Sequence, residues 1–193
     1  MNLPKNKNLI IFDFDETLCT TNGTVKRYNH TTEITDLITP GEYSGWRASG
    51  DYDNNPSNWD LDFSDFMGFP ENGIPIKDTI SILRERISED DCLIALVTGR
   101  DELEGPKQFL QSSYINTDQM ILLCSGNPDK KPCFEGLIST LEPKTVTIYE
   151  DCVEYIVQCE EVCAKYKIPC AAILVTNGEI DWNWRFINGD IYE

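Results

Sequence analysis

The chain has 193 residues, about the length of one ordinary domain, and 40% of them are hydrophobic, so a substantial apolar core can form. It has 16 lysine and arginine residues against 33 aspartate and glutamate residues, which gives a formal net charge of −17. A surface this acidic repels the phosphate backbone, so we do not expect extended binding along duplex DNA. The single histidine, His30, excludes a histidine-rich zinc site and most histidine-based catalysis.

The eight cysteines are expected to be free thiols in a cytoplasmic protein. None belongs to a CxxC pair, and several lie in apolar runs, where a free cysteine packs as a small hydrophobic side chain. We therefore expect neither a disulfide framework nor a zinc site. The first residues lack the apolar segment of a secretory signal, and no stretch reaches the ~18 apolar residues of a membrane span. These features predict a cytoplasmic chain with no membrane partner.

Five short apolar runs predict the strands of a buried parallel sheet, because each is bounded by polar or turn residues. The runs cover residues 9–12, 92–97, 120–124, 146–149 and 171–175. Apolar residues at helical spacing predict helices over 76–87, 133–141 and 151–166. Strands that alternate with helices predict an α/β fold, a Rossmann-like three-layer sandwich with a central parallel sheet. In such a fold the ligand site lies beyond the carboxyl ends of the strands.

Residues 19–75 interrupt this alternation. The segment is rich in Asn, Asp, Gly, Thr and Trp and has weak periodicity, and long insertions of this kind are usually functional or disordered. Its apolar residues are too few to predict a core of its own. We therefore interpret it as a small cap-like insert after the first strand, within a single domain that covers residues 1–193.

Three features of the insert and the tail have alternative interpretations. Residues 51–62 superficially match an EF-hand calcium loop, but Pro56 stands where that loop needs a glycine, so a polar loop is favoured. Trp46 and Trp59 could stack on a nucleobase or form a small apolar core, and the core is favoured. The alternating aromatic residues in the tail, 177–193, predict an extended segment that packs one face against the body.

Polar residues whose side chains can take part in catalysis or binding follow the first and second predicted strands. Asp13 and Asp15 lie two residues apart on an extended chain, so both carboxylates can face one ligand or one metal. Thr98, Gly99 and Arg100 end the second strand, where a hydroxyl and a glycine turn are suited to hydrogen-bond an anionic oxygen. The structural alternatives are solvated acids at a strand end and an ordinary turn.

Two further polar pairs follow later in the chain. Lys130 and Lys131 precede Pro132, which suits the first position of a helix, so a lysine would lie beside a helix N-terminus, where anions are favoured. Glu150 and Asp151 follow the fourth predicted strand and supply oxygen ligands for a hard cation. A solvated lysine pair and a helix cap are the structural alternatives. Since the carboxyl ends of parallel strands meet at one edge, we expect these segments to form one site.

Taken in order, the four segments resemble the four motifs of the haloacid dehalogenase-like phosphohydrolase superfamily. The matching residues are Asp13, Asp15 and Thr17 for DxDxT, Thr98 for the second motif, Lys131 for the third, and Glu150 with Asp151 for the fourth. The segments LVTGR, KKPCF and IYEDC look most like the Swiss Army Knife RNA-repair-like branch, which is similar in outline to polynucleotide 3′-phosphatase domains. The resemblance covers residues 8–175.

The sequence departs from that pattern at three positions. Glu16 replaces a common glycine, and Cys152 stands where the branch usually has arginine. The third-motif lysine is offset, so Lys130 remains an alternative to Lys131. The assignment to the superfamily is therefore firmer than the assignment to the branch.

The resemblance implies a phosphomonoester hydrolase that depends on Mg²⁺ and works through an aspartyl phosphate. Asp13 would be the nucleophile, and Asp15 would protonate the leaving oxygen and then activate the hydrolytic water. Mg²⁺ would be held by Asp13, the backbone carbonyl of Asp15 and Asp151.

The remaining roles follow from the same resemblance. Lys131 and Thr98 would hold phosphoryl oxygens, and Gly99 and Arg100 would contribute to substrate binding. Glu150 would not bind the metal directly but would orient Lys131 or a metal-bound water.

The expected substrate is a phosphorylated small molecule or a nucleic-acid end. The branch resemblance favours a nucleic-acid end or a nucleotide, while the acidic charge disfavours long polymers. A small-metabolite phosphatase is the alternative enzyme. A catalytically silent module that binds Mg²⁺ or another protein is the alternative from a different class, and the intact pair of Asp13 and Asp15 counts against it.

Overall fold

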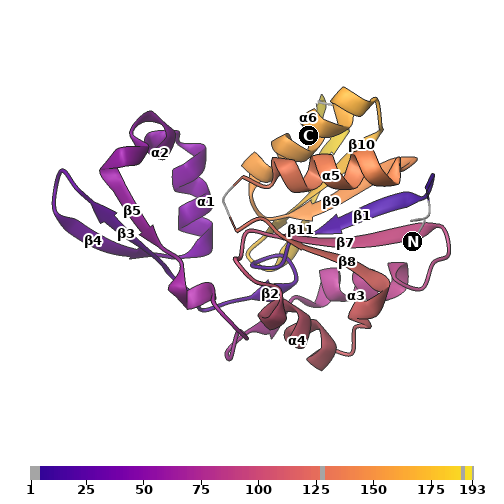
Figure 1. Ribbon diagram of the computed structural model, residues 1–193, viewed down its shortest axis with the longest axis horizontal. Helices are drawn as coiled ribbons and strands as arrows, with labels where there is room; N and C mark the ends of the chain where they lie inside the picture. The colour runs from indigo at the N-terminus through magenta and orange to yellow at the C-terminus, as the bar shows by residue number, and fades with distance from the viewer. Residues whose placement is uncertain (1–4, 127–128, 188–189, 193) are drawn as a thin grey trace.

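The computed structural model describes residues 5–126, 129–187 and 190–192. Figure 1 shows a main body, in which helices cover both faces of a central sheet, and a smaller lobe beside it that the insert forms. Among the described residues, the helices are too short and too polar to cross a membrane.

The central sheet has seven strands in the order β12-β11-β10-β9-β1-β7-β8. Its parallel strands are β1 (Asn8–Phe12), β7 (Cys92–Thr98), β8 (Met120–Cys124), β9 (Thr145–Glu150) and β10 (Cys170–Thr176). The five predicted strands and the α/β class are confirmed.

The tail adds two antiparallel strands, β11 (Glu179–Ile187) and β12 (Asp190–Tyr192), at one edge, so the sheet is mostly parallel. The predicted extended tail is thus confirmed. The predicted packing of its aromatic side chains concerns residues 182–186, whose side chains lie outside the described part of the structure.

Two helices cover each face of this sheet. On one face lie α3 (Lys77–Arg86) and α4 (Glu104–Ser112), and on the other lie α5 (Lys131–Leu141) and α6 (Val153–Tyr166). The three predicted helices are confirmed. The sequence did not predict α4 or the short 3-10 turn η3 (Thr117–Gln119) before β8.

Strand β1 is buried on both faces, which explains why its sequence is an unbroken apolar run. Leu9 and Ile11 point into the core under α5 and α6, and Ile10 and Phe12 point into the core over α3 and α4. This alternation follows from the two-residue period of a strand. Both cores thereby hold the central strand in place, so the residues that directly follow it are also fixed in position.

The insert leaves and rejoins the body through a short ladder, in which β2 (Cys19–Thr20) pairs antiparallel with β6 (Ile74–Pro75). Beyond the ladder, β3 (Val25–Asn29), β4 (Ile34–Ile38) and β5 (Trp59–Asp62) form an antiparallel sheet. The helix α1 (Pro40–Ala48) begins at a capping box, in which Thr39 and Glu42 exchange hydrogen bonds. The shorter helical turns are α2 (Asp51–Asn54), η1 (Pro56–Asn58) and η2 (Ser64–Phe66).

The insert has a small core, contrary to the expectation from its composition. The buried side chains are Val25, Ile38, Tyr43 and Phe66, and Trp46 and Leu61 pack against them. Trp46 and Trp59 meet edge to face with ring centroids 5.0 Å apart, and the Arg27 guanidinium lies over both rings. Aromatic side chains bury a large area each, so a few of them suffice for a core that a count of apolar residues does not predict.

This arrangement confirms the core interpretation for Trp46, and Trp59 packs on the Trp46 ring. The predicted polar loop over residues 51–62 is wrong, because the segment folds into α2, η1 and β5. Pro56 begins η1, a position that suits its fixed backbone angle.

Candidate active site

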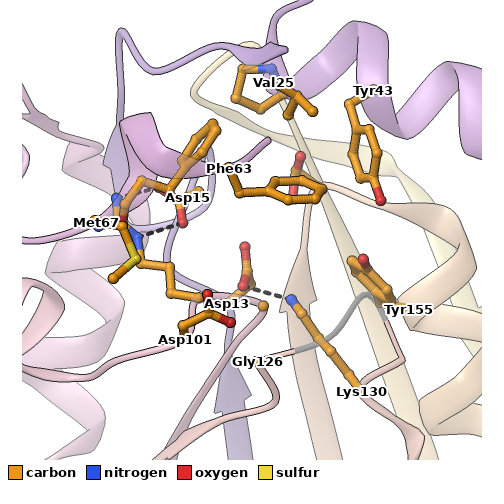
Figure 2. A pocket seen from close by; sticks show the side chains of 15 residues that line it. Asp13, Asp15, Val25, Tyr43, Phe63, Met67, Asp101, Gly126, Lys130 and Tyr155 are labelled. Carbon is orange, nitrogen blue, oxygen red and sulfur yellow. Dashed lines mark hydrogen bonds and ion pairs between the residues drawn. The ribbon is translucent and has the colours of Figure 1, made fainter. Parts of the chain in front are cut away.

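The predicted site segments meet at the carboxyl edge of the central sheet. β1 lies between β7 and β9, so the residues that follow these three strands are neighbours. The backbone N–H of Asp13 donates to the Tyr149 carbonyl (3.0 Å), which continues the pairing of β1 with β9 by one residue. Figure 2 shows Asp13 at the floor of a cavity, with the Lys130 side chain directed at it.

Lys130 is the lysine of this site. Its Nζ lies 2.6 Å from Oδ1 of Asp13 and 2.8 Å from Oε2 of Glu150, and the residue is only 1% exposed. The Tyr155 ring centroid lies 4.4 Å from the same Nζ. Lys130 is the N-cap residue that directly precedes α5, and its backbone N–H donates to the Gln158 side chain of α6.

Lys131 does not reach the site, so its predicted role is corrected. Its Nζ pairs with Glu161 on the surface at 2.6 Å, with both side chains about half exposed. Successive residues at a helix start point about 100° apart, so only one of two neighbouring lysines can face the sheet edge. The structure settles the open alternative in favour of Lys130.

Three carboxylates cluster beside this lysine. Oxygen atoms of Asp13, Glu150 and Asp151 all lie within 4.8 Å of one another. Burial and the neighbouring carboxylates raise the pKa of Asp13 to about 8, and the same causes raise the pKa of Asp151 well above its ordinary value. Carboxylate oxygens crowded in this way fit a hard divalent cation, which would relieve their mutual repulsion.

Asp15 is held by Arg100. The guanidinium donates from Nε and Nη2 to the two carboxylate oxygens, at 2.9 and 2.8 Å, in a bidentate pair. The remaining nitrogen, Nη1, donates to the backbone carbonyls of Phe66 and Gly68 in the insert. Arg100 was predicted to bind substrate. It lines the cavity, and its guanidinium also pairs with Asp15 and joins the insert to the body.

The other predicted residues lie around this pair. Gly99 lines the cavity, whereas Thr98 is fully buried behind it, where its Oγ1 accepts from the Arg100 backbone N–H (3.3 Å). Thr17 is also fully buried, and its Oγ1 has no hydrogen-bond partner within the described residues. Thr98 therefore shapes the turn that carries Gly99 and Arg100.

The cavity lies between the body and the insert and has a volume of about 180 Å³. Its floor carries the charged groups described above, together with Asp101, Gly126 and Tyr155. Its opposite wall comes from the insert and is apolar and aromatic (Figure 2). That wall consists of Val25, Pro40, Tyr43, Phe63, Phe66 and Met67. The sequence did not identify this wall, because its residues come from an insert with no clear periodicity.

The fold and the cavity define an α/β protein with a pocket at the carboxyl edge of its sheet, in which acidic residues of the body face a wall formed by the insert. No family model and no curated protein matches the chain. The chain is similar to the crystal structure of the Legionella pneumophila effector Ceg4 with an N-terminal TEV protease cleavage sequence, with a TM-score of 0.56. The two are 18% identical, over 94% of this chain and 91% of that one, a likeness that shows the fold alone.

Proposed function

We propose that this chain is a phosphomonoester hydrolase of the haloacid dehalogenase-like type, with a Rossmann-like body, a cap-like insert and Asp13 as its nucleophile. One observation carries the proposal: Asp13 follows the central strand, pairs with the buried Lys130 and shares a cluster with two more carboxylates. An isolated strand-end acid would be solvated. Here the acid is buried beside a cavity that can admit a ligand.

The carboxylate cluster fits Mg²⁺ through Asp13, Asp151 and the backbone carbonyl of Asp15. When bound, the ion would neutralise charge where an anionic nucleophile meets an anionic phosphate. Lys130 contributes a second positive charge at the same place and holds Asp13 in a fixed orientation. Glu150 accepts from Lys130 on the other side, so the lysine stays charged and in place.

The chemistry proceeds in two displacements on these residues. An oxygen of Asp13 attacks phosphorus, the bond to the leaving oxygen breaks, and Asp15 gives that oxygen a proton. Asp15, now a carboxylate, takes a proton from a water that attacks the aspartyl phosphate. Inorganic phosphate then leaves, and Asp13 is regenerated. The bidentate contact with Arg100 fixes the position of Asp15 at the cavity.

The cavity favours a particular kind of leaving group. Its insert wall offers Tyr43 and Phe63, and Tyr155 extends the aromatic surface from the body. Such a wall suits a flat group, such as a nucleobase, better than a strongly hydrated sugar. The net charge of −17 disfavours long polymers, so we place a mononucleotide or the terminal phosphate of a short oligonucleotide first. Small phosphorylated metabolites are the second candidate, because the cavity is small.

The test is release of phosphate with Mg²⁺ from 3′- and 5′-phosphorylated oligonucleotides, mononucleotides and sugar phosphates. The natural chain is compared with Asp13→Asn and with Asp118→Asn, the same change at an exposed position. We expect release that disappears in Asp13→Asn and after removal of Mg²⁺ and is unchanged in Asp118→Asn. Equal release from all three proteins, or no release on any substrate, would overturn the proposal. The preferred substrate class decides between the two candidates.

A further inference from the structure

Three cysteines form a compact group at the opposite edge of the sheet from the acidic cavity. Cys159 and Cys163 lie one turn apart on α6, and Cys170 is the first residue of β10. Their Sγ atoms all lie within 4.8 Å of one another, and no side chain of the three is more than 4% exposed. All three are free thiols.

A fourth polar group accompanies these sulfur atoms. Oε1 of Glu160 is buried and has no hydrogen-bond partner among the described residues. Glu160, Cys163 and Cys170 also line one surface cavity of about 560 Å³, so an ion can reach the group from solvent. A buried carboxylate oxygen without a partner carries a free-energy cost, which a cation bound at the nearby cysteines would relieve.

We propose that Cys159, Cys163 and Cys170 bind one Zn²⁺ ion, and that the Glu160 carboxylate, which lines the same cavity but lies outside the group of sulfur atoms, turns toward them to complete the site. Three soft thiolates and one oxygen give the four ligands that zinc takes in proteins. Binding releases the thiol protons to solvent. The ion would tie the C-terminal half of α6 to the start of β10, apart from the proposed hydrolytic site.

The ordinary alternative is that the three cysteines only fill the core, since they also contact the apolar side chains between the sheet and α6. That alternative leaves the buried oxygen of Glu160 without a role.

The absence of CxxC argues against zinc only when ligands come from a tight turn. Residues i and i+4 of a helix lie on the same face, so Cys159 and Cys163 achieve the same placement with a different spacing. Cys170 follows after a short connection and reaches the pair because β10 lies beside α6. The expectation of no zinc used the lack of CxxC together with the apolar surroundings of several cysteines, and the helical spacing answers the first of these two grounds.

The test is titration of the full chain, freed of metal, with Co²⁺ and then Zn²⁺. We expect thiolate-to-cobalt charge-transfer absorption and the strong visible bands of tetrahedral Co²⁺, both removed by one equivalent of Zn²⁺. Co²⁺ at the carboxylate cluster has only oxygen ligands and gives no thiolate band. The result therefore does not depend on the proposed hydrolytic function.

Two variants and a matched control complete the test. Cys163→Ser should abolish the thiolate band, whereas Cys133→Ser, a half-buried cysteine of α5 outside the group, should retain it. Glu160→Gln keeps the side-chain shape and should weaken Zn²⁺ binding at least tenfold. No thiolate band in the natural chain, an equal band in folded Cys163→Ser, or unchanged affinity in Glu160→Gln would overturn the four-ligand site. If Cys163→Ser does not fold, the band of the natural chain and the affinity of Glu160→Gln decide the matter.

Discussion

Lys130 places one positive charge among buried carboxylates, so its removal should strongly lower the free energy of unfolding. In Lys130→Met, Asp13 and Glu150 lose ion pairs of 2.6 and 2.8 Å. Removal of one partner from a buried pair costs about 3–5 kcal/mol, and because one lysine serves two acids here we expect the upper end, about 5 kcal/mol. A domain of this size loses roughly 2–4 °C of unfolding midpoint per kcal/mol, so the midpoint should fall by roughly 10–20 °C.

The assay is thermal unfolding by circular dichroism in metal-free buffer, with Lys131→Met as the matched control. Lys131 pairs with Glu161 on the surface, so its loss should leave the midpoint unchanged within error. The double variant Lys130→Met with Glu150→Gln should recover part of the loss, since one uncompensated carboxylate is removed. A Lys130→Met midpoint within a few degrees of the natural chain would refute the reasoning.

The same variant should respond to pH in a defined direction. The folded pKa of Asp13 is already raised to about 8 by burial and its acidic neighbours. Loss of Lys130 removes the group that lowers it, so the folded pKa rises further above the unfolded value. An acid with a raised folded pKa destabilises the protein as the pH increases. The stability deficit of Lys130→Met should therefore grow as the pH rises through 8, and a deficit that shrinks there would contradict this account.

Two other changes probe how the insert is fastened. Arg100→Met removes the hydrogen bonds to the Asp15 carboxylate and to the insert carbonyls, so it should lower the free energy of unfolding by roughly 1.5–3 kcal/mol. It should also reduce phosphate release and speed proteolysis within the insert, when both are measured beside the natural chain. Unchanged proteolysis would argue against the contact between Arg100 and the insert. Gly105→Ala would place a Cβ 1.9 Å from the Gly68 carbonyl oxygen and should cost about 1–3 kcal/mol. Gly136→Ala, within α5 and with open space around it, should instead stabilise by about 0.5–1 kcal/mol, and a similar gain at Gly105 would disprove the close approach.

The strands could be predicted because each core strand of a parallel sheet is buried on both faces and appears as an apolar run. β1 is the clearest case, with alternate residues in two cores. The helices α1 and α4 could not be predicted in the same way. α4 carries Gly105 and Pro106 in its first turn, which resembles a break in the sequence although both residues are tolerated there. α1 depends on its capping box and on packing within the insert.

The site could be predicted as a set of strand ends but not as a set of contacts. The choice between Lys130 and Lys131 depends on the rotation of α5 about its axis, which neighbouring residues in a sequence do not reveal. The partner of Arg100 lies 85 residues earlier, at Asp15. Its contacts with the insert depend on where the chain passes Phe66 and Gly68. Such long-range pairings are set by the fold and leave no periodic pattern.

The two-residue ladder at the base of the insert has a consequence for how this protein can diversify. Because Cys19 pairs with Pro75 and Thr20 with Ile74, the insert begins and ends at one point of the body. The insert therefore connects β2 and β6 in the way that a loop connects the two strands of a hairpin. A change in the number of residues in the insert costs little in loop-closure entropy. The residues proposed to perform the chemistry all lie outside it. One lobe can therefore be exchanged for another as a module, so that the ligand admitted changes while the reaction is kept.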